Sequence, residues 1–568
     1  MDEIKDYNGQ PVLAVDGGQD KAMVSSASLE KIPKHEVGEG EPKEEELHRT
    51  LTEGQVGMIA IGGAIGTGLI LGTGSGLVQA GPAGLLIAYI IMGFVCFGTL
   101  SAMGELSCYM PHKRGFAGHA SQFVEEGFGF AVGVNYLLKY LVVTPAQLNA
   151  SALIISYWRP DINGGVWITV FGAAIVSLNI VGGVRFFGHV EFWLSFLKII
   201  VLVALIILMV VINTGGTPQG DYIGFTNWGG GLAFQEYIKT GSLGRFLGTW
   251  SAFVSALYAY MGSELIGVTV GECKNPRKAI PRAIRSTFLR IAIFYVGLCF
   301  LVGLNVPSDS PLLLGSTKSS VKGTASASPF VVAIRIAEIK VLPGFLNACL
   351  LIFTFSAANS DLYIASRTLY GLAKSKQAPK IFLTCNKKGT PWVALAFCSL
   401  FISIAYINVR SSGAAAFTYL QNSVTIFGSI TWLGIQITHQ RFLAGLKAQG
   451  IDRKDLAYRS PYQPYYGWFC MFVTSLVMIF KGFSAFTPKF NINSFVTNYI
   501  GIPIFILLWF GWKIVNKTPF HRASEMDLFT GARELVDVED ELDEESFLSK
   551  RLGVVKNMVK RKPEGQAV

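Results

Sequence analysis

Long apolar stretches recur along most of this 568-residue chain, each about the length that a helix needs to cross a lipid bilayer. A spanning helix takes about 20 mainly apolar residues. Such stretches lie at 57–80, 83–110, 128–157, 164–183, 190–212, 246–271, 281–304, 341–372, 391–408, 413–440, 465–486 and 495–515. The sequence therefore predicts an all-α membrane protein with about twelve transmembrane helices.

Charged residues are scarce, at 15% of the chain against 51% hydrophobic residues. A soluble domain carries about a quarter charged residues. This chain therefore has too little charge to cover a water-facing surface and must present apolar surface to lipid. The 8 cysteines form no CxxC pair and mostly lie in apolar stretches, which indicates small core residues rather than metal ligands. No metal or other cofactor is expected.

The formal net charge of +10 follows the topology of the predicted helices. With the N-terminus inside, basic residues concentrate in the cytosolic loops and are fewer in the outer loops. The most basic loops lie around residues 113–114, 274–285, 374–388 and 441–459. This bias predicts that both termini are cytosolic, and it accounts for the charge without a nucleic-acid partner.

The two ends of the chain differ from its apolar middle. Residues 1–50 are polar and predict a cytosolic tail, mostly disordered, before a transmembrane core at 51–520. Residues 521–568 predict a second cytosolic tail with an acidic run at 537–545. Two interpretations of the tails stay open: simply solvated chain, or docking sites for ubiquitin-ligase machinery that regulates trafficking. Within the core, the apolar segment 328–334 is too short to cross and predicts an outer half-helix at the interface.

The first predicted helix carries a run of glycines, in Gly62-Gly63-Ala64-Ile65-Gly66-Thr67-Gly68. Each glycine costs a helix about 1 kcal/mol relative to alanine. One interpretation is close helix packing through small residues four apart, which Gly62 and Gly66 fit. The other is an unwound stretch at the bilayer midplane, whose N–H groups face an anionic group and whose carbonyls face a cation.

The sixth predicted helix combines a glycine break with a buried acid, in Tyr258-Ala259-Tyr260-Met261-Gly262-Ser263-Glu264. An intramembrane carboxylate is costly unless it is paired or neutralised, so it marks a functional site by default. Two broken helices, the first and the sixth, are also what a transporter built from inverted repeats requires. The second break therefore favours the unwound interpretation of the first helix.

Ordered motifs at several spans point to a known family. They are GGAIGTGLILGTG in the first span, GELSCYMP after the second, EFWLSFLK in the fifth, YMGSELIGVTVGECKNPRKAIPRAI at the sixth and NSDLYIASRTLYGLAKSKQAPKIF at the eighth. These motifs resemble the fungal amino acid permeases of the amino acid–polyamine–organocation superfamily. The resemblance runs from about Leu51 to Phe529, and the third and eighth spans look most like the dicarboxylic amino acid permeases. It implies a five-plus-five inverted repeat with broken helices 1 and 6, plus two appended helices.

The resemblance also implies a substrate-binding site at the two breaks. The substrate α-carboxylate would meet N–H groups near Thr67 and Gly68, at a helix N-terminus whose dipole favours anions. The α-amine would meet the backbone carbonyls of Ala64, Tyr258 and Met261. The implied substrate-binding residues at the breaks are Ala64, Ile65, Gly66, Thr67, Gly68, Tyr258, Met261 and Gly262.

Two charged residues resemble groups that couple transport to protons in this family. Glu264 resembles the acid that links substrate occupancy to gating. Lys198 resembles a fifth-span lysine whose ammonium replaces the sodium ion of related carriers. A desolvated lysine loses its proton more readily than an exposed one, which suits that role.

Lys139 lies about twelve residues, or roughly 18 Å, into the third predicted span, too deep for its ammonium to reach the interface easily. Either it pairs with an acid or with carbonyls of a neighbouring helix, or it faces the side-chain carboxylate of an acidic substrate. Related permeases mostly carry a neutral residue there and a glutamate where this chain has Gln147, so the exchange favours negative substrates. Asp361 replaces a usually small or neutral residue and is expected to pair with Arg367 as structure.

The phosphate-binding motif GxxxxGK[ST] is missing from the sequence, which indicates transport driven by an ion gradient rather than by nucleotide hydrolysis. Together these features predict a plasma-membrane proton/amino acid symporter, not an enzyme, that imports L-glutamate and L-aspartate. The alternatives are a broad-range or neutral amino acid permease, or a nutrient-sensing receptor with the same fold.

Overall fold

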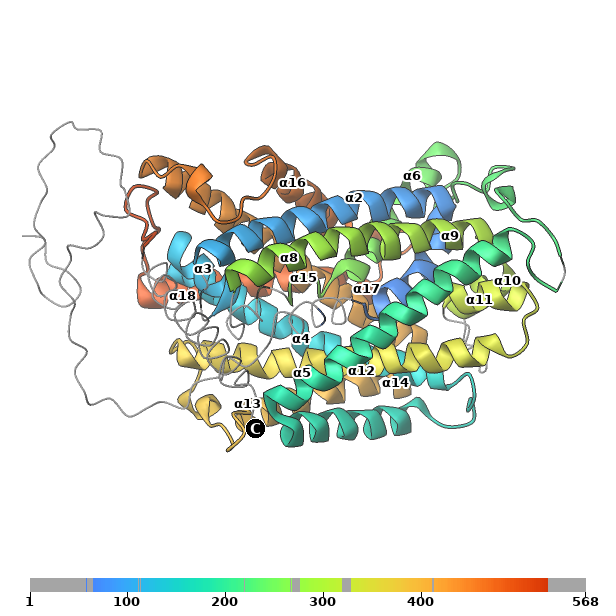
Figure 1. Cartoon of the computed structure of the whole chain (residues 1–568), viewed down its shortest axis with the longest axis horizontal. Coiled ribbons are helices and arrows are strands. Elements are labelled where there is room, and N and C mark those ends of the chain that lie inside the picture. Colours follow the sequence, from blue (N-terminus) through green and yellow to red (C-terminus); the bar gives the residue numbers. More distant parts are fainter. Residues whose placement is uncertain are drawn as a thin grey trace, which may run out of the picture. The chain divides into compact units, whose positions relative to one another are not determined.

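The computed structural model describes residue 58 and residues 65–110, 112, 114–218, 220–265, 267, 276–318, 328–410 and 413–529. The chain divides into residues 1–46 and 47–568, and every described residue belongs to the second unit. The predicted tail at 1–50 and most of the tail at 521–568 therefore lie outside the described residues. Within the described ranges, all regular structure is helical (Figure 1).

The first two predicted spans meet in one helical run that turns at Gly81. The short helix η2 (Gly68–Gly72) leads directly into α2 (Thr73–Tyr109). Gly81 has a φ of +73°, and a Cβ there would lie 2.6 Å from the carbonyl oxygen of Ala233. Glycine suits such a conformation and such a close approach. The gap predicted between the first and second spans is thus where the helix changes direction.

Two further predicted spans also form one helix. α5 (Gly164–Asn213) covers the fourth and fifth stretches, and Figure 1 shows it turning a corner between them. The third and eighth stretches are the long helices α4 (Glu126–Ile155) and α12 (Leu342–Lys374). The tenth is α15 (Gly413–Ala448).

The other spans are built from shorter pieces. They are α6 (Gly241–Tyr260); α8 (Pro276–Arg290), η5 (Ile291–Gly297) and α9 (Leu298–Asn305); α13 (Trp392–Leu400), η7 (Phe401–Tyr406) and α14 (Ile407–Arg410); α16 (Tyr465–Phe480); and α17 (Ile492–Tyr499) with α18 (Gly501–Asn516). The connections hold α3 (Gly115–Phe123), η3 (Thr226–Trp228), α10 (Pro311–Lys318), α11 (Pro329–Ile336), η6 (Lys380–Leu383), η8 (Arg453–Asp455) and η9 (Phe483–Phe486). α11 is the short helix predicted at 328–334.

Eight helical segments among the described residues are long and apolar enough to cross a membrane, and α17 with α18, bent by 42°, makes a ninth if the pair counts as one span. Their outer faces carry large apolar side chains: Trp193, Ile207 and Leu507 are 57%, 60% and 71% exposed. Water would not favour so much exposed apolar surface, whereas lipid does. The multi-pass membrane class is confirmed, and the count of twelve spans stays a prediction.

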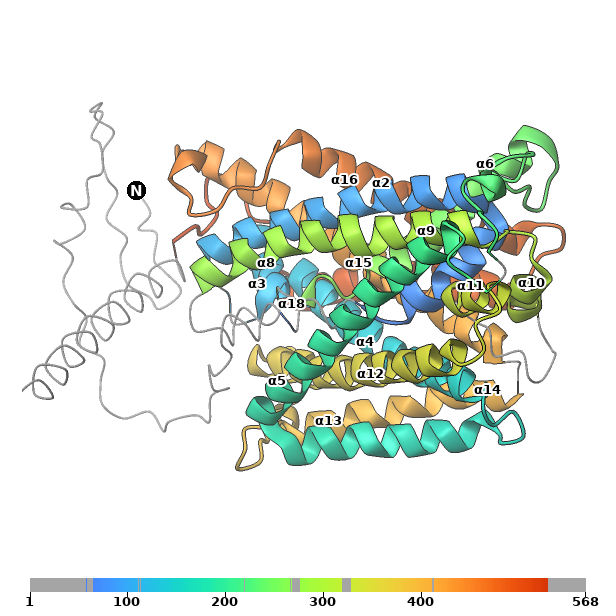
Figure 2. The same ribbon diagram turned by 45° about the vertical axis from the view of Figure 1, so that its right-hand side comes forward.

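α4 occupies the interior of the bundle. It packs against α12 and α15, and also against α5 and α18. α2 lies alongside α8 and α9, as Figures 1 and 2 both show, and packs closely on α6. This arrangement brings α4, α12 and the broken end of α6 around one interior region.

The packed structure continues beyond the boundary predicted at residue 520. Met526 and Leu528 are buried in a cluster with Phe123 of α3 and Phe442 of α15. The backbone also participates, since the N–H of His521 donates to the carbonyl of Val124 at 3.0 Å. The first residues of the predicted C-terminal tail are therefore part of the folded unit.

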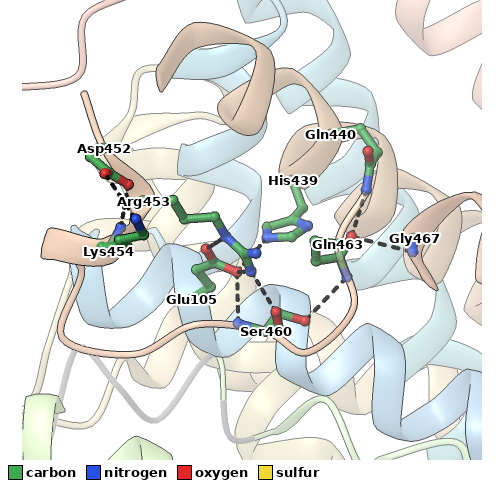
Figure 3. A network of polar contacts seen from close by, with 9 residues as sticks. All are labelled: Glu105, His439, Gln440, Asp452, Arg453, Lys454, Ser460, Gln463 and Gly467. Atoms are coloured by element: carbon green, nitrogen blue, oxygen red, sulfur yellow. Dashed lines mark hydrogen bonds and ion pairs between the residues drawn. The ribbon is translucent and has the colours of Figure 1, made fainter. Parts of the chain in front are cut away.

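A buried ion-pair cluster ties the end of α2 to α15 and to the segment that follows it (Figure 3). Glu105, in the last turn of α2, is fully buried. Its carboxylate accepts from Arg453 Nε at 2.6 Å and Nη2 at 2.7 Å, and lies 3.0 Å from His439 Nε2. The backbone N–H of Ser460 donates to it at 2.8 Å. Four polar contacts thus compensate the burial of one carboxylate.

We expect Glu105→Gln to destabilise the protein, because it leaves a largely buried arginine without its charge partner. Breaking a buried ion pair costs about 3–5 kcal/mol of stability. Because the Arg453 side chain is 27% exposed, we expect a loss near the lower end of this range. The measurement is the unfolding temperature of the detergent-purified protein. Asp452→Asn is the control, since Asp452 lies 4.0 Å from Lys454 with both side chains exposed and should shift it little. Equal shifts in the two variants would contradict this assignment.

Candidate functional site

The first span is interrupted just before η2. Ile65 and Gly66 form a bend, and regular helix begins at Thr67 and Gly68. Thr67 makes no side-chain capping bond at this helix start. Because the first N–H groups of a helix have no partner within it, this end favours an anion. Ala64, predicted to contribute a carbonyl, lies outside the described residues.

The sixth span is interrupted where predicted. α6 ends at Tyr260, Met261 is extended (φ −61°, ψ 143°) and Gly262 has a φ of +94°. This φ is rarely adopted by residues with a Cβ. The carbonyl of Tyr258 accepts from the N–H of Met261 at 3.2 Å, so the chain leaves the helix in a tight turn.

The two interruptions touch each other. A Cβ on Gly68 would lie 2.5 Å from Ala259 Cα and 2.9 Å from the carbonyl oxygen of Tyr258. The hydroxyls of Thr67 and Tyr258 are 2.9 Å apart. Gly66 therefore lies in the bend, and Gly68 allows close backbone packing. The packing predicted through Gly62 and Gly66 stays a prediction, because Gly62 lies outside the described residues.

A buried cavity lies where these segments meet α4 and α12. Seven predicted site residues line it: Gly66, Thr67, Gly68, Lys139, Tyr258, Met261 and Gly262. Five more also line it: Tyr140, Val143, Gln147, Ala259 and Asp361. Ile65 is buried but does not line the cavity. Helical spacing could have found part of the second set, because residues four apart share a face, as positions 139, 143 and 147 do.

Lys139 forms an ion pair with Glu264 beside this cavity. Its ammonium donates to Oε1 of Glu264, and both side chains are almost fully buried, at 1% and 0% exposed. The other carboxylate oxygen, Oε2, accepts from the N–H of Gly262 at 3.1 Å and from Nε1 of Trp432 at 3.2 Å. Tyr140 adds a ring whose centre lies 4.9 Å from the ammonium. The predicted substrate-facing lysine and the predicted coupling acid are thus partners.

Lys198 lies outside the cavity lining, in a second buried ion pair. Its Nζ is 3.8 Å from Oε1 of Glu191, and both side chains are fully buried. Ser356 of α12 donates to the same carboxylate, at 2.9 and 3.0 Å from its two oxygens. The pair therefore joins α5 to α12.

Asp361 differs from the expectation drawn from the sequence. Its carboxylate is hydrogen-bonded to Gln147 of α4, and Oδ2 has no hydrogen-bond partner among the described residues. The guanidinium carbon of Arg367 lies 3.3 Å from the centre of the Tyr363 ring instead. Six residues apart on one helix, Asp361 and Arg367 point to different sides, which explains why the expected pair does not form.

Comparison with known proteins identifies the family. The sequence profile described as "Amino acid permease" matches residues 55–525. This chain belongs to the amino acid permease family. The Dicarboxylic amino acid permease of Saccharomyces cerevisiae is 43% identical over 510 residues, covering 89% of this chain and 83% of that protein. The Proline-specific permease of Emericella nidulans is 37% identical, covering 90% and 95%. The Basic amino-acid permease of Saccharomyces cerevisiae is 34% identical, covering 90% and 87%.

A solved structure supports the fold class. A manganese transporter from Eremococcus coleocola superposes with a TM-score of 0.55 at 15% sequence identity, covering 82% of this chain and 94% of that one. At this identity the likeness concerns the fold alone. Membership of the amino acid permease family makes this protein a transporter rather than an enzyme.

We expect Gly68→Ala and Gly262→Ala each to abolish uptake of every substrate. The first forces a Cβ against the backbone of α6, and the second places a Cβ at a φ of +94°. Gly371→Ala is the control, because a Cβ there meets nothing within 4 Å. The measurement is initial uptake of several amino acids at matched surface levels. Normal uptake by the two site variants would show that the meeting of the breaks is not required.

Proposed function

We propose that this permease imports L-glutamate and L-aspartate together with protons across the plasma membrane, with both tails in the cytosol. The observation that carries the proposal is the buried ion pair between Lys139 and Glu264 beside the cavity. The relatives are named for dicarboxylic amino acids, proline and basic amino acids. The substrate of this chain must therefore be argued from its own cavity.

The two helix breaks supply groups for the part that all amino acids share. The α-carboxylate binds at the helix start formed by Thr67 and Gly68, where backbone N–H groups and the helix dipole favour an anion. The α-ammonium binds carbonyls of the extended turn at Tyr258 and Met261. These contacts are the same for every amino acid, so they provide affinity without selecting a side chain.

Lys139 selects the side chain. A second carboxylate that enters a buried site needs a cation, because an unpaired buried charge is costly. Among the described residues that line the cavity, Lys139 is the one with a cationic side chain. Gln147, four residues beyond Val143 on the same face, adds no negative charge that would repel it.

Protonation of Glu264 couples this binding to the proton gradient. In the structure, Glu264 already holds the ammonium of Lys139. A proton on Glu264 removes its negative charge and frees Lys139 for the substrate carboxylate. The neutral acid keeps the donors from Gly262 and Trp432 on Oε2, so it stays in place. Substrate and proton therefore bind together, and each stabilises the state that the other needs.

Lys198 serves the same coupling from outside the cavity. Its buried ammonium lies beside Glu191 of the same helix, and the Glu191 carboxylate accepts from Ser356 of α12. It provides a fixed positive charge where the family resemblance places the sodium ion of related carriers. Any docking of ubiquitin-ligase machinery concerns the tails, which lie largely outside the described residues.

Two other functions remain as alternatives with clear tests. A broad-range or neutral amino acid permease would take up neutral amino acids as well as glutamate. A nutrient-sensing receptor with this fold would move no substrate at all. Uptake of radiolabelled amino acids in cells that lack their own permeases distinguishes both from the proposed function.

We expect Lys139→Gln to depress glutamate and aspartate uptake far more than any uptake of glutamine. Loss of one partner of a buried pair costs about 3–5 kcal/mol, a factor of hundreds or more in affinity. Lys139→Arg keeps the charge in a different shape and should lose only part of the uptake. The measurement is the glutamate-to-glutamine uptake ratio at matched surface levels.

The matched control is Lys481→Gln. Lys481 is also buried, but it donates to the carbonyl of Asn422 and to Thr425 outside the cavity, so its loss should leave the ratio unchanged. An unchanged ratio in Lys139→Gln would mean that Lys139 is structural and that acid selectivity, if present, arises elsewhere.

Proton coupling predicts a second result. Uptake should rise as the external pH falls, collapse with a protonophore and not respond to replacement of sodium. Lys198→Met should abolish accumulation while leaving surface expression intact, because it removes the fixed positive charge beside Glu191. Sodium-dependent uptake that survives the protonophore would rule out proton coupling.

A further inference from the structure

Asp361 is the one carboxylate in the cavity lining of the described residues, and the proposed function gives it no role. It lies in the middle of α12 and is 5% exposed. One side of its carboxylate is hydrogen-bonded to Gln147, and Oδ2 has no hydrogen-bond partner among the described residues. A buried carboxylate oxygen without a donor is costly while the group is charged, whereas a protonated carboxyl is neutral.

The charged groups around Asp361 do not balance its charge. It interacts electrostatically with Lys139 of α4 and with Lys198 and Glu191 of α5. Each lysine already has a carboxylate partner, Glu264 for Lys139 and Glu191 for Lys198. Two cations thus face three acids in this region, which leaves one negative charge on Asp361.

Among the described residues, the other titratable groups shown to interact with Asp361 are phenols. They are Tyr136 and Tyr140 of α4 and Tyr258 of α6. A phenol is neutral at physiological pH and supplies no positive charge. Within the described ranges, the packing around α12 therefore offers Asp361 a hydrogen bond and two lysines that already have carboxylate partners, but no cation of its own.

We propose that Asp361 is a second proton-accepting residue of the site, which takes up a proton before an acidic amino acid binds. This inference rests on the proposed function. An ionised Asp361 would share Lys139 with the incoming side-chain carboxylate and repel it. Glu264 must release Lys139, and Asp361 must not compete for it, so each takes one proton. One glutamate anion then enters with two protons, and the loaded protein carries one net positive charge inward.

The stoichiometry gives the proposal a direct test in proteoliposomes that contain the full-length protein. The wild type should carry one positive charge per glutamate, measured as current against radiolabelled uptake. Asp361→Asn mimics the protonated residue, so it should still transport glutamate while carrying about zero net charge. Uptake by Asp361→Asn should no longer respond to an imposed membrane potential. Ser360→Ala is the control, because Ser360 is the neighbouring buried residue but does not line the cavity; its uptake should respond as in wild type.

Binding at alkaline pH provides the second readout. Where both carboxyl groups are ionised in the free protein, each obligatory proton weakens glutamate binding about tenfold per pH unit. Wild type should lose affinity about a hundredfold per pH unit, and Asp361→Asn only about tenfold. A merely structural Asp361 would not change this slope. Asp361→Glu, which keeps the acid, should restore the steeper dependence.

Distinct results would overturn each claim. If the wild type carries no net charge per glutamate, the claim that a second proton enters with each glutamate is wrong, whether or not any variant folds. Asp361→Asn that keeps the wild-type charge ratio and pH slope would also refute it, leaving proton-coupled import intact. Wild-type glutamate uptake that ignores the pH gradient would instead refute the proposed function itself.

Discussion

A charged side chain inside a membrane needs a partner, and the ion pair of Lys139 with Glu264 is the contact on which this site depends. The lysine is on α4, in the interior of the bundle, and the acid is in the turn that follows α6. Trp432 of α15 holds the far side of the carboxylate. Three elements distant in the sequence are thus joined by one neutralised pair, and its opening would disturb all three.

The close approach of the two helix breaks has a steric cause as well as an electrostatic one. Gly68 packs against the backbone of Ala259, and the turn at Gly262 needs a conformation that suits glycine. Helix ends freed inside the bundle leave N–H and carbonyl groups that must be satisfied within protein or by a ligand. The same glycines that let the segments touch therefore also create the polar groups that an amino acid backbone can satisfy.

α12 stands between the two buried ion pairs. Ser356 binds the carboxylate of Glu191, the partner of Lys198, while Asp361 faces Lys139 and Gln147. A change of charge at either pair therefore acts on the same helix. This placement gives a physical route by which the proposed substrate site and the Lys198–Glu191 pair can influence each other, since a change of charge at either alters the forces on α12.

The sequence by itself determined the membrane class and the interrupted sixth helix. The depth of Lys139 in its span indicated one cavity residue, and the resemblance to a known family implied six more. Apolar length, glycine density and an acid within a span are all properties of one short segment. Each can therefore be recognised along the chain without knowing which other segments pack against it. The sequence also raised both roles of Lys139, pairing with an acid and facing a substrate. It could not choose between them, because the partner, Glu264, is 125 residues away. Only the tertiary structure decided that Lys139 meets Glu264 and that Asp361 meets Gln147 rather than Arg367, because those pairings depend on how α4, α6 and α12 pack.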